Sequence, residues 1–309
     1  MREKEDFKIA AVVVTYNRLN KLKKALLSYE NQLHKPDYMI IVDNASNDGT
    51  PEWLNEWQSK THGFIVDIIR AEKNLGGSGG FYLGQKKAME TGADWIMLAD
   101  DDAYPANDYI MGLYKYIRSN VVDDISVVCG AVEENGSLYN NHHRSVIKKF
   151  KYQLNFLDNA PKENYKKTEF YINNASYVGI LINALKLKKV GLVDKDFFIW
   201  WDDVEHIIRL GKVGRLICLP SIIMQHDVES INKALSWKSY YGCRNKLICH
   251  KRHMPFTFIP IVIFLGFKTI LAPLKGKSIE EVKMRFVAIK DAILDNMGMN
   301  STYKPGWKP

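Results

Sequence analysis

Short apolar runs alternate with longer amphipathic segments along the first part of the chain. The apolar runs have the length of buried strands, and the segments between them repeat apolar residues three and four positions apart, as helices do. Such alternation predicts βαβ units and a mostly parallel sheet. The expected strands are residues 10–14, 38–42 and 65–69, and the expected helices between them are residues 19–32 and 50–60.

The alternation continues beyond these units, with one polar interruption. Strands are expected at 95–99, 125–132, 177–181 and 216–219, and helices at 108–120 and 204–210, with two more that end at Glu90 and Lys189. Residues 133–169 are polar and weakly periodic, so we expect an insertion of turns and short strands there. Beyond Ser236 the sequence becomes aromatic, basic and helical. We therefore expect an α/β domain at residues 1–235 and a helical extension at residues 236–309.

Composition narrows the class of protein but not its activity. The 309 residues are 46% hydrophobic and 25% charged, which is typical of a globular protein with a sizeable core. The 43 Lys and Arg residues exceed the 35 Asp and Glu residues and give a formal charge of +8. Such a surplus is compatible with nucleic acid, an anionic membrane surface or phosphate-bearing substrates.

Cysteine usage and the lengths of the apolar runs indicate a cytoplasmic protein. The four cysteines are dispersed, without a CxxC pair, so we expect neither a zinc site nor a disulfide framework. Residues 1–6 carry charges of both signs, and the apolar run at 9–14 is too short for a signal peptide. No window reaches the roughly 18 apolar residues that a membrane-spanning helix needs.

Three adjacent carboxylates, Asp100, Asp101 and Asp102, directly follow the expected strand at 95–99. They should therefore lie at the carboxyl edge of the sheet, where ligands of open α/β sheets bind. Adjacent like charges repel one another, and a divalent cation with a preference for oxygen ligands would relieve that repulsion. The alternative is a solvated acidic turn.

A glycine-rich segment, Asn74–Gly80, precedes the helix that ends at Glu90. It is not a P-loop, because it lacks Gly-Lys-Ser/Thr, and it does not match GxGxxG. Its glycines would let the backbone approach a ligand closely at a helix N-terminus, where amide groups favour negative charge. A flexible turn is the alternative.

Four motifs in this order resemble those of family 2 of the inverting nucleotide-sugar glycosyltransferases: Val12–Arg18, Val42–Thr50, Asn74–Gly80 and Asp100–Asp102. The similarity runs from about residue 7 to residue 250. It implies the GT-A fold, which is a Rossmann-like α/β arrangement with a mostly parallel central sheet. It also implies a metal-dependent inverting hexosyltransferase with a nucleotide-sugar donor and Mn²⁺ or Mg²⁺ as cofactor.

The resemblance implies roles for individual residues. The first loop matches the segment that lies against the nucleotide, and Asp43 matches the acid that hydrogen-bonds the base. Asp100 and Asp102 match the outer carboxylates of a DxD-type motif, which reach the ribose and the metal. Asp101 either contacts the donor with them or has the lesser role of shaping the turn. The implied donor set is Thr15, Tyr16, Arg18, Asp43, Asn74, Gly76, Gly77, Gly79, Asp100 and Asp101.

A second acidic pair, Asp202 and Asp203, follows Trp200 and Trp201 where a helix is expected to start. An inverting transfer needs a carboxylate that takes the proton of the acceptor hydroxyl. Apolar surroundings raise the pKa of a carboxyl, and indole faces stack on sugar rings. We predict that one of the pair, with preference for Asp203, is the catalytic base, and that Trp200, Trp201 and Asp202 contact the acceptor. The alternative is that the pair caps the helix, although both roles can coexist.

His226 lies 23 residues beyond Asp203. A lone His is usually structural or exposed, but an imidazole added to two carboxylates is a common divalent-metal set. The family has a metal-binding His at this place, so the resemblance implies the set Asp100, Asp102 and His226. Arg144, next to His142 and His143 in the insertion, could hold a phosphate bidentately or lie in a solvated loop.

The complete Asp triple, the motif Trp201–Glu205 and His226 are most similar to the galactofuranosyltransferases of the family. This similarity implies UDP-galactofuranose as the donor. The chain is shorter than the polymerising members, so we expect a single addition rather than processive transfer. Rhamnosyltransferases share the early motifs, and dTDP-rhamnose is the alternative donor.

The C-terminal extension favours contact with a membrane. Its apolar run at 256–267 is short and contains Pro260, so we expect it to lie in the interface rather than to span the bilayer. The basic residues expected to meet anionic headgroups are Arg244, Lys246, Lys251, Arg252 and Lys268. The alternative is a helix packed on the core or on a second subunit of a homo-oligomer. We expect attachment to the inner face of the cell membrane and a glycan or lipid-linked glycan acceptor, as in the synthesis of surface polysaccharides.

Two non-catalytic classes of protein stay open. A nucleic-acid-binding protein would use the positive charge and the basic, aromatic extension, but it leaves both acidic groups without a role, so we expect no nucleic acid partner. A lectin-like protein would bind glycan through Trp200 and Trp201 without turning over a donor.

Overall fold

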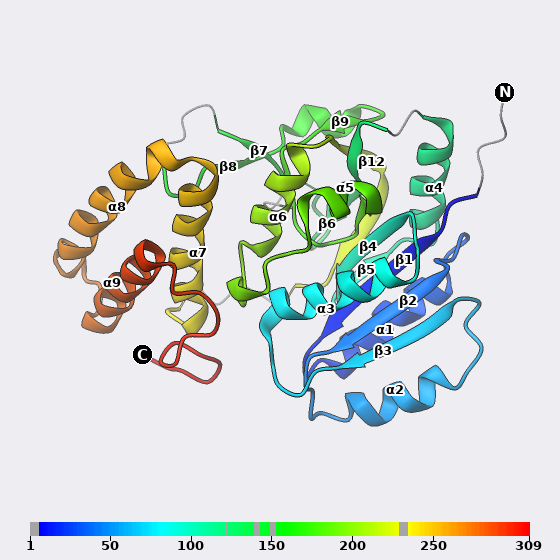
Figure 1. Ribbon diagram of the computed structural model, residues 1–309, viewed down its shortest axis with the longest axis horizontal. Coiled ribbons are helices and arrows are strands. Elements are labelled where there is room, and N and C mark those ends of the chain that lie inside the picture. The colour runs from blue at the N-terminus through cyan, green and yellow to red at the C-terminus, as the bar shows by residue number, and fades with distance from the viewer. Residues whose placement is uncertain (1–5, 121–122, 139–142, 149–152, 229–233) are drawn as a thin grey trace.

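The central sheet contains the predicted strands and several that the pattern does not predict (Figure 1). This computed structural model describes residues 6–120, 123–138, 143–148, 153–228 and 234–309, and in these ranges the sheet is nine-stranded, with the order β3-β2-β1-β4-β11-β6-β12-β5 and β9 paired to β12. Its strands are β1 (Ile9–Thr15), β2 (Tyr38–Asp43), β3 (Ile65–Arg70), β4 (Trp95–Asp100), β5 (Ala103–Pro105), β6 (Ile125–Glu133), β9 (Phe170–Tyr171), β11 (Ile180–Asn183) and β12 (Arg215–His226). Residues 1–5 and His142, considered above, lie outside the described ranges.

Most of the strands run in one direction, which confirms the predicted α/β class. β1 pairs in parallel with β2 and β4, β2 with β3, and β6 with β12. Because β11 is antiparallel to both β4 and β6, these two strands share a direction. The short strands β5 and β9 are antiparallel to β12. The carboxyl ends of β1, β2, β4 and β6 therefore lie along one edge of the sheet.

Helices cover both faces of the sheet. One face carries α1 (Leu19–Glu30), α2 (Thr50–Gln58) and α4 (Tyr109–Ser119), and the other carries α3 (Gly76–Glu90), α5 (Ala184–Val190) and α6 (Asp202–Gly211). Successive residues of β1 point to opposite faces, so that Val13 packs in the first layer, whereas Val12 and Val14 pack in the second. Burial on both faces explains why this strand is a continuous apolar run.

The glycine-rich segment is helical, which makes the flexible-turn alternative wrong. Residues 76–80 form the first turns of α3. A Cβ atom added at Gly80 would lie 2.4 Å from Val14 Cγ1, and one added at Gly84 would lie 2.2 Å from Val12 Cγ1. These two glycines allow α3 to pack closely on β1, which brings the N-terminus of α3 to the carboxyl edge of the sheet.

The polar insertion contains short strands and a turn, as the sequence predicts, and two of these strands form a small second sheet with β10 (Asn174–Ala175). In it β7 (Arg144–Ile147) is antiparallel to both β8 (Leu157–Asn159) and β10. A 3₁₀ turn at Lys162–Lys166 follows β8.

The strand that leads to His226 is longer than the predicted run at 216–219. β12 continues through Pro220, where the register against β6 shifts between Leu219 and Ile223. Proline has no N–H to donate to a ladder, so a strand can contain it only where the pairing is interrupted. The prediction that the strand ends before Pro220 is therefore wrong, and His226 is the last residue of β12.

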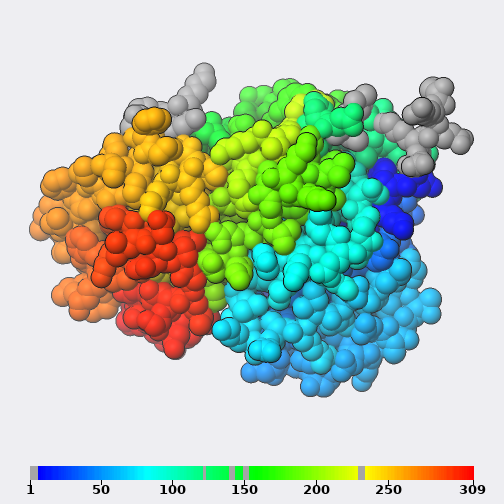
Figure 2. Space-filling model, viewed as in Figure 1, coloured from blue at the N-terminus to red at the C-terminus, as the bar shows by residue number. Residues whose placement is uncertain are grey.

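Three helices form the C-terminal end of the molecule, which confirms the predicted helical extension. They are α7 (Trp237–His253), α8 (Pro255–Ile270) and α9 (Ile279–Leu294). A 3₁₀ turn at Pro273–Lys275 connects α8 to α9, and another at Lys195–Phe197 precedes α6. Figures 1 and 2 show these helices as one lobe beside the sheet. Their apolar core includes Phe197, Phe198 and Val204, so the extension packs directly on the segment that carries Asp202 and Asp203. Across the described ranges, no helix combines the length and the apolar content that crossing a bilayer requires.

Candidate active site

The chain reverses direction after the acidic triple and thereby brings His226 beside it. Asp100 ends β4, and Ala103 begins β5, which pairs with the end of β12 so that Ala103 lies opposite His226. The Nε2 atom of His226 is 3.3 Å from Asp102 Oδ1. Ligand atoms of Asp100, Asp102 and His226 all lie within 4.8 Å of one another. These three residues form the donor set that a divalent cation prefers, and they could hold one ion together.

A second group of side chains, Glu134 and His143, contacts the other nitrogen of His226. The Nδ1 atom of His226 is 3.1 Å from Glu134 Oε1 and 3.2 Å from His143 Nε2. His143 Nε2 is itself 2.8 Å from Glu134 Oε1, and its Nδ1 is 2.6 Å from Ser176 Oγ. Burial opposes protonation of His226, but Asp102 on one ring nitrogen and Glu134 on the other outweigh it and raise its pKa. If a cation were bound, a proton on Nδ1 donated to Glu134 would leave the lone pair of Nε2 available to the ion.

The sequence analysis does not predict a role for Glu134, although a signal for it exists. Glu134 directly follows β6, whose carboxyl end lies at the same edge as that of β4. The strand-end argument that identifies the Asp triple applies equally to this residue. His143 carries no such signal, because its position depends on the insertion.

The three carboxyl groups of the triple differ in the direction of their pKa shifts. Burial raises the pKa of Asp100 well above its usual value, and the neighbouring Asp102 raises it further. Burial also raises the pKa of Asp101, to about 6. Burial opposes ionisation of Asp102 as well, but the hydrogen bond and charge of His226, with the charge of Arg18, outweigh it and lower the pKa of Asp102. A buried site that disfavours several carboxylate charges at once is one that a cation would stabilise.

Arg18 and Thr15 hold the second and third carboxylates of the triple, Asp101 and Asp102. Arg18 Nη1 is 2.7 Å from Asp102 Oδ2 and 3.1 Å from Asp101 Oδ1. Thr15 Oγ1 donates to Asp101 Oδ2 at 2.8 Å. Lys21 Nζ lies 3.7 Å from Asp102 Oδ2. Asp101 is thus fixed by two residues of the first loop, which ties β1 to the turn after β4.

A cavity of about 200 Å³ opens beside the triple and contains most of the predicted donor-binding residues. Those that line it are Thr15, Tyr16, Arg18, Asn74, Gly76, Gly77, Asp100 and Asp101. Phe198 and Ile199 line it from the segment before the acidic pair, and Trp237 and Lys238 line it from the start of α7.

Two predicted donor residues lie behind this lining. Asp43 is buried at the end of β2, where its Oδ1 accepts a hydrogen bond of 2.9 Å from the amide of Ser46. Its neighbour Asn44 lines the cavity instead. Gly79 faces its own helix, because a Cβ atom there would lie 2.5 Å from Leu75 Cβ.

The segment between the cavity and the acidic pair has an unusual backbone. Phe198, Trp200 and Trp201 have φ values of 67°, 63° and 69°. The left-handed region costs an L-residue roughly 1–2 kcal/mol, and such residues persist only where surrounding contacts fix them. This strained segment, residues 198–201, places Phe198 and Ile199 in the cavity and leaves the side chain of Trp200 about half exposed.

Hydrogen bonds from two other elements hold the strained segment. Asn245 of α7 is fully buried, and its Nδ2 lies 3.1, 2.9 and 2.8 Å from the carbonyl oxygens of Phe197, Ile199 and Trp200. The amide of Ser78 in α3 donates to the carbonyl oxygen of Phe198 at 3.2 Å. The donor cavity and the acidic pair are therefore connected through one fixed stretch of backbone.

Asp202 and Asp203 form the first turn of α6, two residues before the predicted helix start. Burial raises the pKa of Asp202 to about 6. Burial, followed by the charge of Asp202, raises the pKa of Asp203 to about 7. Asp203 Oδ1 accepts a hydrogen bond of 2.7 Å from the amide of Val204, and this helix-terminal contact is compatible with a second role. A carboxyl with a pKa near neutrality is suited to general base catalysis.

Two arginines have structural roles that the sequence analysis does not predict. Arg144 is 1% exposed, and its guanidinium donates to the carbonyl oxygens of Gly130, His143 and Val178, each at 2.8 Å. The interpretation of Arg144 as a phosphate ligand or as part of a solvated loop is therefore wrong.

Arg244, predicted to meet lipid headgroups, is also 1% exposed. It donates to the carbonyl oxygens of Phe197 and Gly298 at 3.0 and 2.8 Å. Its guanidinium is occupied inside the protein, so the prediction of a headgroup contact for Arg244 is wrong.

Comparison with known proteins agrees with the fold and the motifs. Residues 10–183 match the sequence profile of glycosyl transferase family 2. Galactofuranosyltransferase GlfT1 of Mycolicibacterium smegmatis is 30% identical over 208 residues, which cover 67% of this chain and 66% of that relative. The dTDP-rhamnosyl transferase RfbF of Shigella flexneri is 24% identical over 302 residues, which cover 92% of this chain and 95% of the relative. The matched part of GlfT1 is thus just under two thirds of its length.

Solved structures share the fold at low sequence identity. The structure of S. aureus TarS 1-349 in complex with UDP-GlcNAc has a TM-score of 0.61 and 16% identity, and covers 93% of this chain and 80% of that one. GalNAc-T7 with UDP, GalNAc and Mn²⁺ has a TM-score of 0.64 and 14% identity, and covers 94% of this chain and 57% of that one.

Proposed function

This chain belongs to glycosyl transferase family 2, and we propose that it is an inverting glycosyltransferase that moves a sugar from a nucleotide-sugar donor to a hydroxyl group of a glycan or lipid-linked glycan. The observation that carries this proposal is the arrangement of Asp100, Asp102 and His226 beside a cavity at the carboxyl edge of the sheet. A cavity next to a cation-binding set suits a diphosphate, whose charge needs compensation.

Asp203 is the base of the proposed reaction. The acceptor oxygen forms a bond to the anomeric carbon of the donor sugar while its proton passes to Asp203. The bond between that carbon and the diphosphate oxygen breaks, and its electron pair leaves with the nucleoside diphosphate. Attack from the face opposite the leaving group inverts the configuration of the anomeric carbon.

Asp100, Asp102 and His226 would hold a divalent cation, either Mn²⁺ or Mg²⁺. A cation bound there neutralises charge on the departing diphosphate. The mixed carboxylate and imidazole donors and the burial of Asp101 and Asp102 in the triple support this assignment. Arg18 reaches the same carboxylates and lines the cavity, so it can also approach a donor phosphate.

UDP-galactofuranose is the preferred donor, and dTDP-rhamnose is the second candidate. The 30% identity to galactofuranosyltransferase GlfT1 supports the first. The second is supported by the match to RfbF, which extends over 92% of this chain and so includes most of the C-terminal extension. Single addition is proposed in either case.

The acceptor lies on the side of the strained segment, in contact with Trp200, Trp201 and Asp202. In this proposal residues 1–235 bind the donor and catalyse, and residues 236–309 approach the membrane. Large apolar side chains of α8 support that orientation, since Phe256, Phe264 and Phe267 are 89%, 63% and 64% exposed. The protein would then act at the inner face of the cell membrane in polysaccharide synthesis.

A donor panel tests the proposal. The purified chain is incubated with UDP and dTDP sugars, each with Mn²⁺, with Mg²⁺ and with EDTA, and release of nucleoside diphosphate is measured. We expect turnover with UDP-galactofuranose that requires a divalent cation. Turnover only with dTDP-rhamnose would show that this sugar nucleotide, and not UDP-galactofuranose, is the donor. Undiminished turnover in EDTA would contradict the proposed metal cofactor. No turnover with any donor would overturn the proposed activity.

A further inference from the structure

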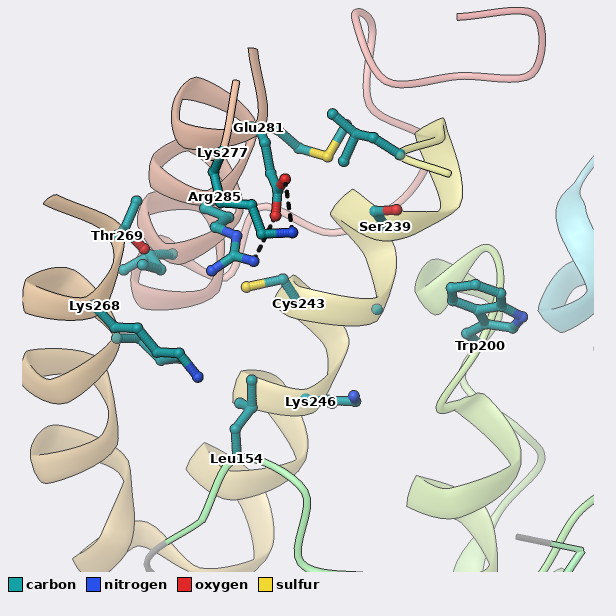
Figure 3. A pocket seen from close by; sticks show the side chains of 15 residues that line it. Leu154, Trp200, Ser239, Cys243, Lys246, Lys268, Thr269, Lys277, Glu281 and Arg285 are labelled. Atoms are coloured by element: carbon teal, nitrogen blue, oxygen red, sulfur yellow. Dashed lines mark hydrogen bonds and ion pairs between the residues drawn. The ribbon is translucent and has the colours of Figure 1, made fainter. Parts of the chain in front are cut away.

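A second cavity, larger than the donor cavity, lies between the three C-terminal helices and the strained segment. It encloses about 430 Å³, and residues of α7, α8 and α9 line it together with Trp200 (Figure 3). We call it the basic cavity, because its charged lining side chains are Lys246, Lys268, Lys277, Arg285 and Glu281. The metal site and the donor cavity share none of these five residues.

Most of the positive charge in the basic cavity is not neutralised. Glu281 is shared between Arg285, at 2.6 Å, and Lys277, at 3.4 Å. Neither Lys246 nor Lys268 forms an ion pair with any carboxylate in the part of the chain that the structure describes. Four cationic side chains against one carboxylate leave an excess of three positive charges around one cavity. An anion would relieve their mutual repulsion.

Lys246 is partly buried, and an aromatic ring contacts its ammonium group. Burial lowers the pKa of Lys246, and its Nζ lies 5.2 Å from the centre of the Trp201 ring. Lys268 extends from α8 into the space between α8 and α7, as Figure 3 shows. Both lysines line the basic cavity, Lys268 from α8 and Lys246 from the side of α7 that faces Trp200 (Figure 3). Lysine ammonium groups are common ligands of phosphate.

The basic cavity lies next to the proposed acceptor position. Helix α7 borders both cavities: Trp237 and Lys238 in its first turn line the donor cavity, and Gly242 and Lys246 further along line the basic cavity. Trp200 lies against this part of α7: Lys238 Nζ is 5.9 Å from its ring centre, and a Cβ atom at Gly242 would lie 3.3 Å from its Cε3. A sugar on Trp200 would have its next chemical group within this cavity.

The opposite border of the basic cavity is the exposed apolar face of α8. Lys268 lines the cavity, and its Nζ is 6.0 Å from the ring centre of Phe264. Phe267, beside it in sequence, is 64% exposed. In Figure 2 the orange surface of α8 forms the outer edge of the molecule. An anion in the cavity therefore has an indole on one side and an apolar surface on the other.

We propose that the basic cavity binds the phosphate or diphosphate group of a lipid-linked acceptor, with Lys246 and Lys268 as its main ligands. The order of surfaces matches the order of groups in such a molecule, namely sugar at Trp200, phosphate at the lysines and hydrocarbon at α8. This inference rests on the proposed function for the identity of the acceptor, but the anion site itself can be tested without catalysis.

Binding of inorganic pyrophosphate to the full chain tests the site. Calorimetry in EDTA, without donor, excludes metal-dependent binding at the Asp triple. We expect Lys246→Gln/Lys268→Gln to bind pyrophosphate at least roughly tenfold more weakly than the wild type, as expected when charge-assisted hydrogen bonds are lost. The control Lys86→Gln/Lys115→Gln removes the same charge from exposed positions of α3 and α4 and should bind like the wild type. Lys268→Gln alone, at an exposed position, should weaken binding in the same direction.

Vesicles distinguish a lipid-borne phosphate from a free one. Phosphatidylcholine vesicles that contain either a polyprenyl phosphate or the same charge of phosphatidylglycerol are sedimented with the protein. We expect preference for the polyprenyl phosphate, and loss of that preference in Lys246→Gln/Lys268→Gln. Pyrophosphate binding without this preference would overturn the lipid assignment, and equal pyrophosphate binding by wild type and double variant would overturn the site.

The two proposals fail separately. A protein that turns over a nucleotide sugar but binds pyrophosphate equally well with and without the two lysines overturns only the basic cavity. A protein that turns over no donor, yet loses pyrophosphate binding in the double variant, overturns only the proposed function.

Discussion

His226 lies 3.3 Å from Asp102 because the chain turns back immediately after the acidic triple and pairs β5 with the end of β12. Only two residues separate the end of β4 from the start of β5, so the pairing of Ala103 with His226 fixes the imidazole relative to the carboxylates. Hydrogen bonds of the backbone thus assemble the candidate metal site, and the side chains of Glu134 and His143 complete it.

Glu134→Ala should weaken binding of Mn²⁺ by roughly 10–100-fold, the usual effect of removing a group that orients a metal ligand. The carboxylate of Glu134 lies 3.1 Å from His226 Nδ1 and can accept its proton, so Glu134→Gln, which keeps an acceptor oxygen, should restore part of the affinity. Titration with Mn²⁺ followed by electron paramagnetic resonance measures it. Glu133→Ala changes the adjacent carboxylate and is the control. Equal Mn²⁺ affinity in wild type and Glu134→Ala would exclude an orienting role.

Asp203→Asn should abolish most of the transfer activity while leaving donor binding intact. General base catalysis contributes typically 10²–10⁴-fold, so we expect a loss of kcat of about that size. The KM for the donor should change little, because Asp203 does not line the donor cavity. Asp196→Asn, at an exposed acid seven positions earlier in the chain, is the matched control. A variant with near-normal kcat would remove Asp203 from the reaction.

The rate of transfer should depend on pH through the same residue. The pKa of Asp203 is raised to about 7, and the base is active only as the carboxylate. The rate should therefore fall as the pH decreases through 7 and reach a plateau above it. A profile of kcat against pH in the wild type checks the sign, and a rate that rises toward acidic pH would contradict it.

Gly76→Ala should destabilise the protein, and Gly77→Ala should not. Gly76 has a φ of 73°, and a Cβ atom there would lie 2.0 Å from the carbonyl oxygen of Phe198. Because that atom belongs to the backbone, the clash cannot be relieved by rotating a side chain, and the expected loss is about 1–3 kcal/mol. A Cβ atom at Gly77 meets no atom within 4 Å. Denaturant unfolding of both variants measures the difference, and equal stabilities would contradict the prediction.

Phe264→Glu/Phe267→Glu should release the protein from anionic vesicles. Transfer of one large apolar side chain from water contributes about 1.5–3 kcal/mol, so we expect affinity to fall at least roughly tenfold. Sedimentation with phosphatidylglycerol vesicles measures it. Leu185→Glu alters an apolar residue of α5 that is 72% exposed and provides the control. If both variants sediment like the wild type, α8 is covered by another partner.

The parts of the fold that depend on local pattern are predictable from the sequence. Strands buried on both faces, such as β1 and β4, are continuous apolar runs, and their carboxyl ends identify the edge where the acidic triple lies. The fold class follows from the alternation of these runs with helices. The assignment of catalytic and donor-binding roles to Asp203, Asp43 and their partners stays a prediction.

The rest depends on contacts between distant segments, which no local pattern encodes. β5 has only three residues and exists because β12 offers it a partner. Arginine usually lies at the surface, yet Arg144 and Arg244 are buried, and their guanidinium groups donate to backbone carbonyl oxygens inside the protein. Glu134 and His143 are close to His226 only after the sheet has formed. Long-range hydrogen bonding decides all of these positions.

The three hydrogen bonds from Asn245 make the C-terminal extension a support of the backbone before the acidic pair. One amide group of α7 fixes the backbone that leads to Asp202, so the shape of the strained segment depends on the extension as well as on the sheet. A chimera that joins these first 235 residues to the last helices of a relative would keep the sheet side of its donor cavity but lose Trp237 and Lys238 from the lining. Its strained segment would also change shape, unless an asparagine occupied the position of Asn245. If the proposed acceptor position is correct, we expect acceptor specificity and the sequence of α7 to vary together among relatives.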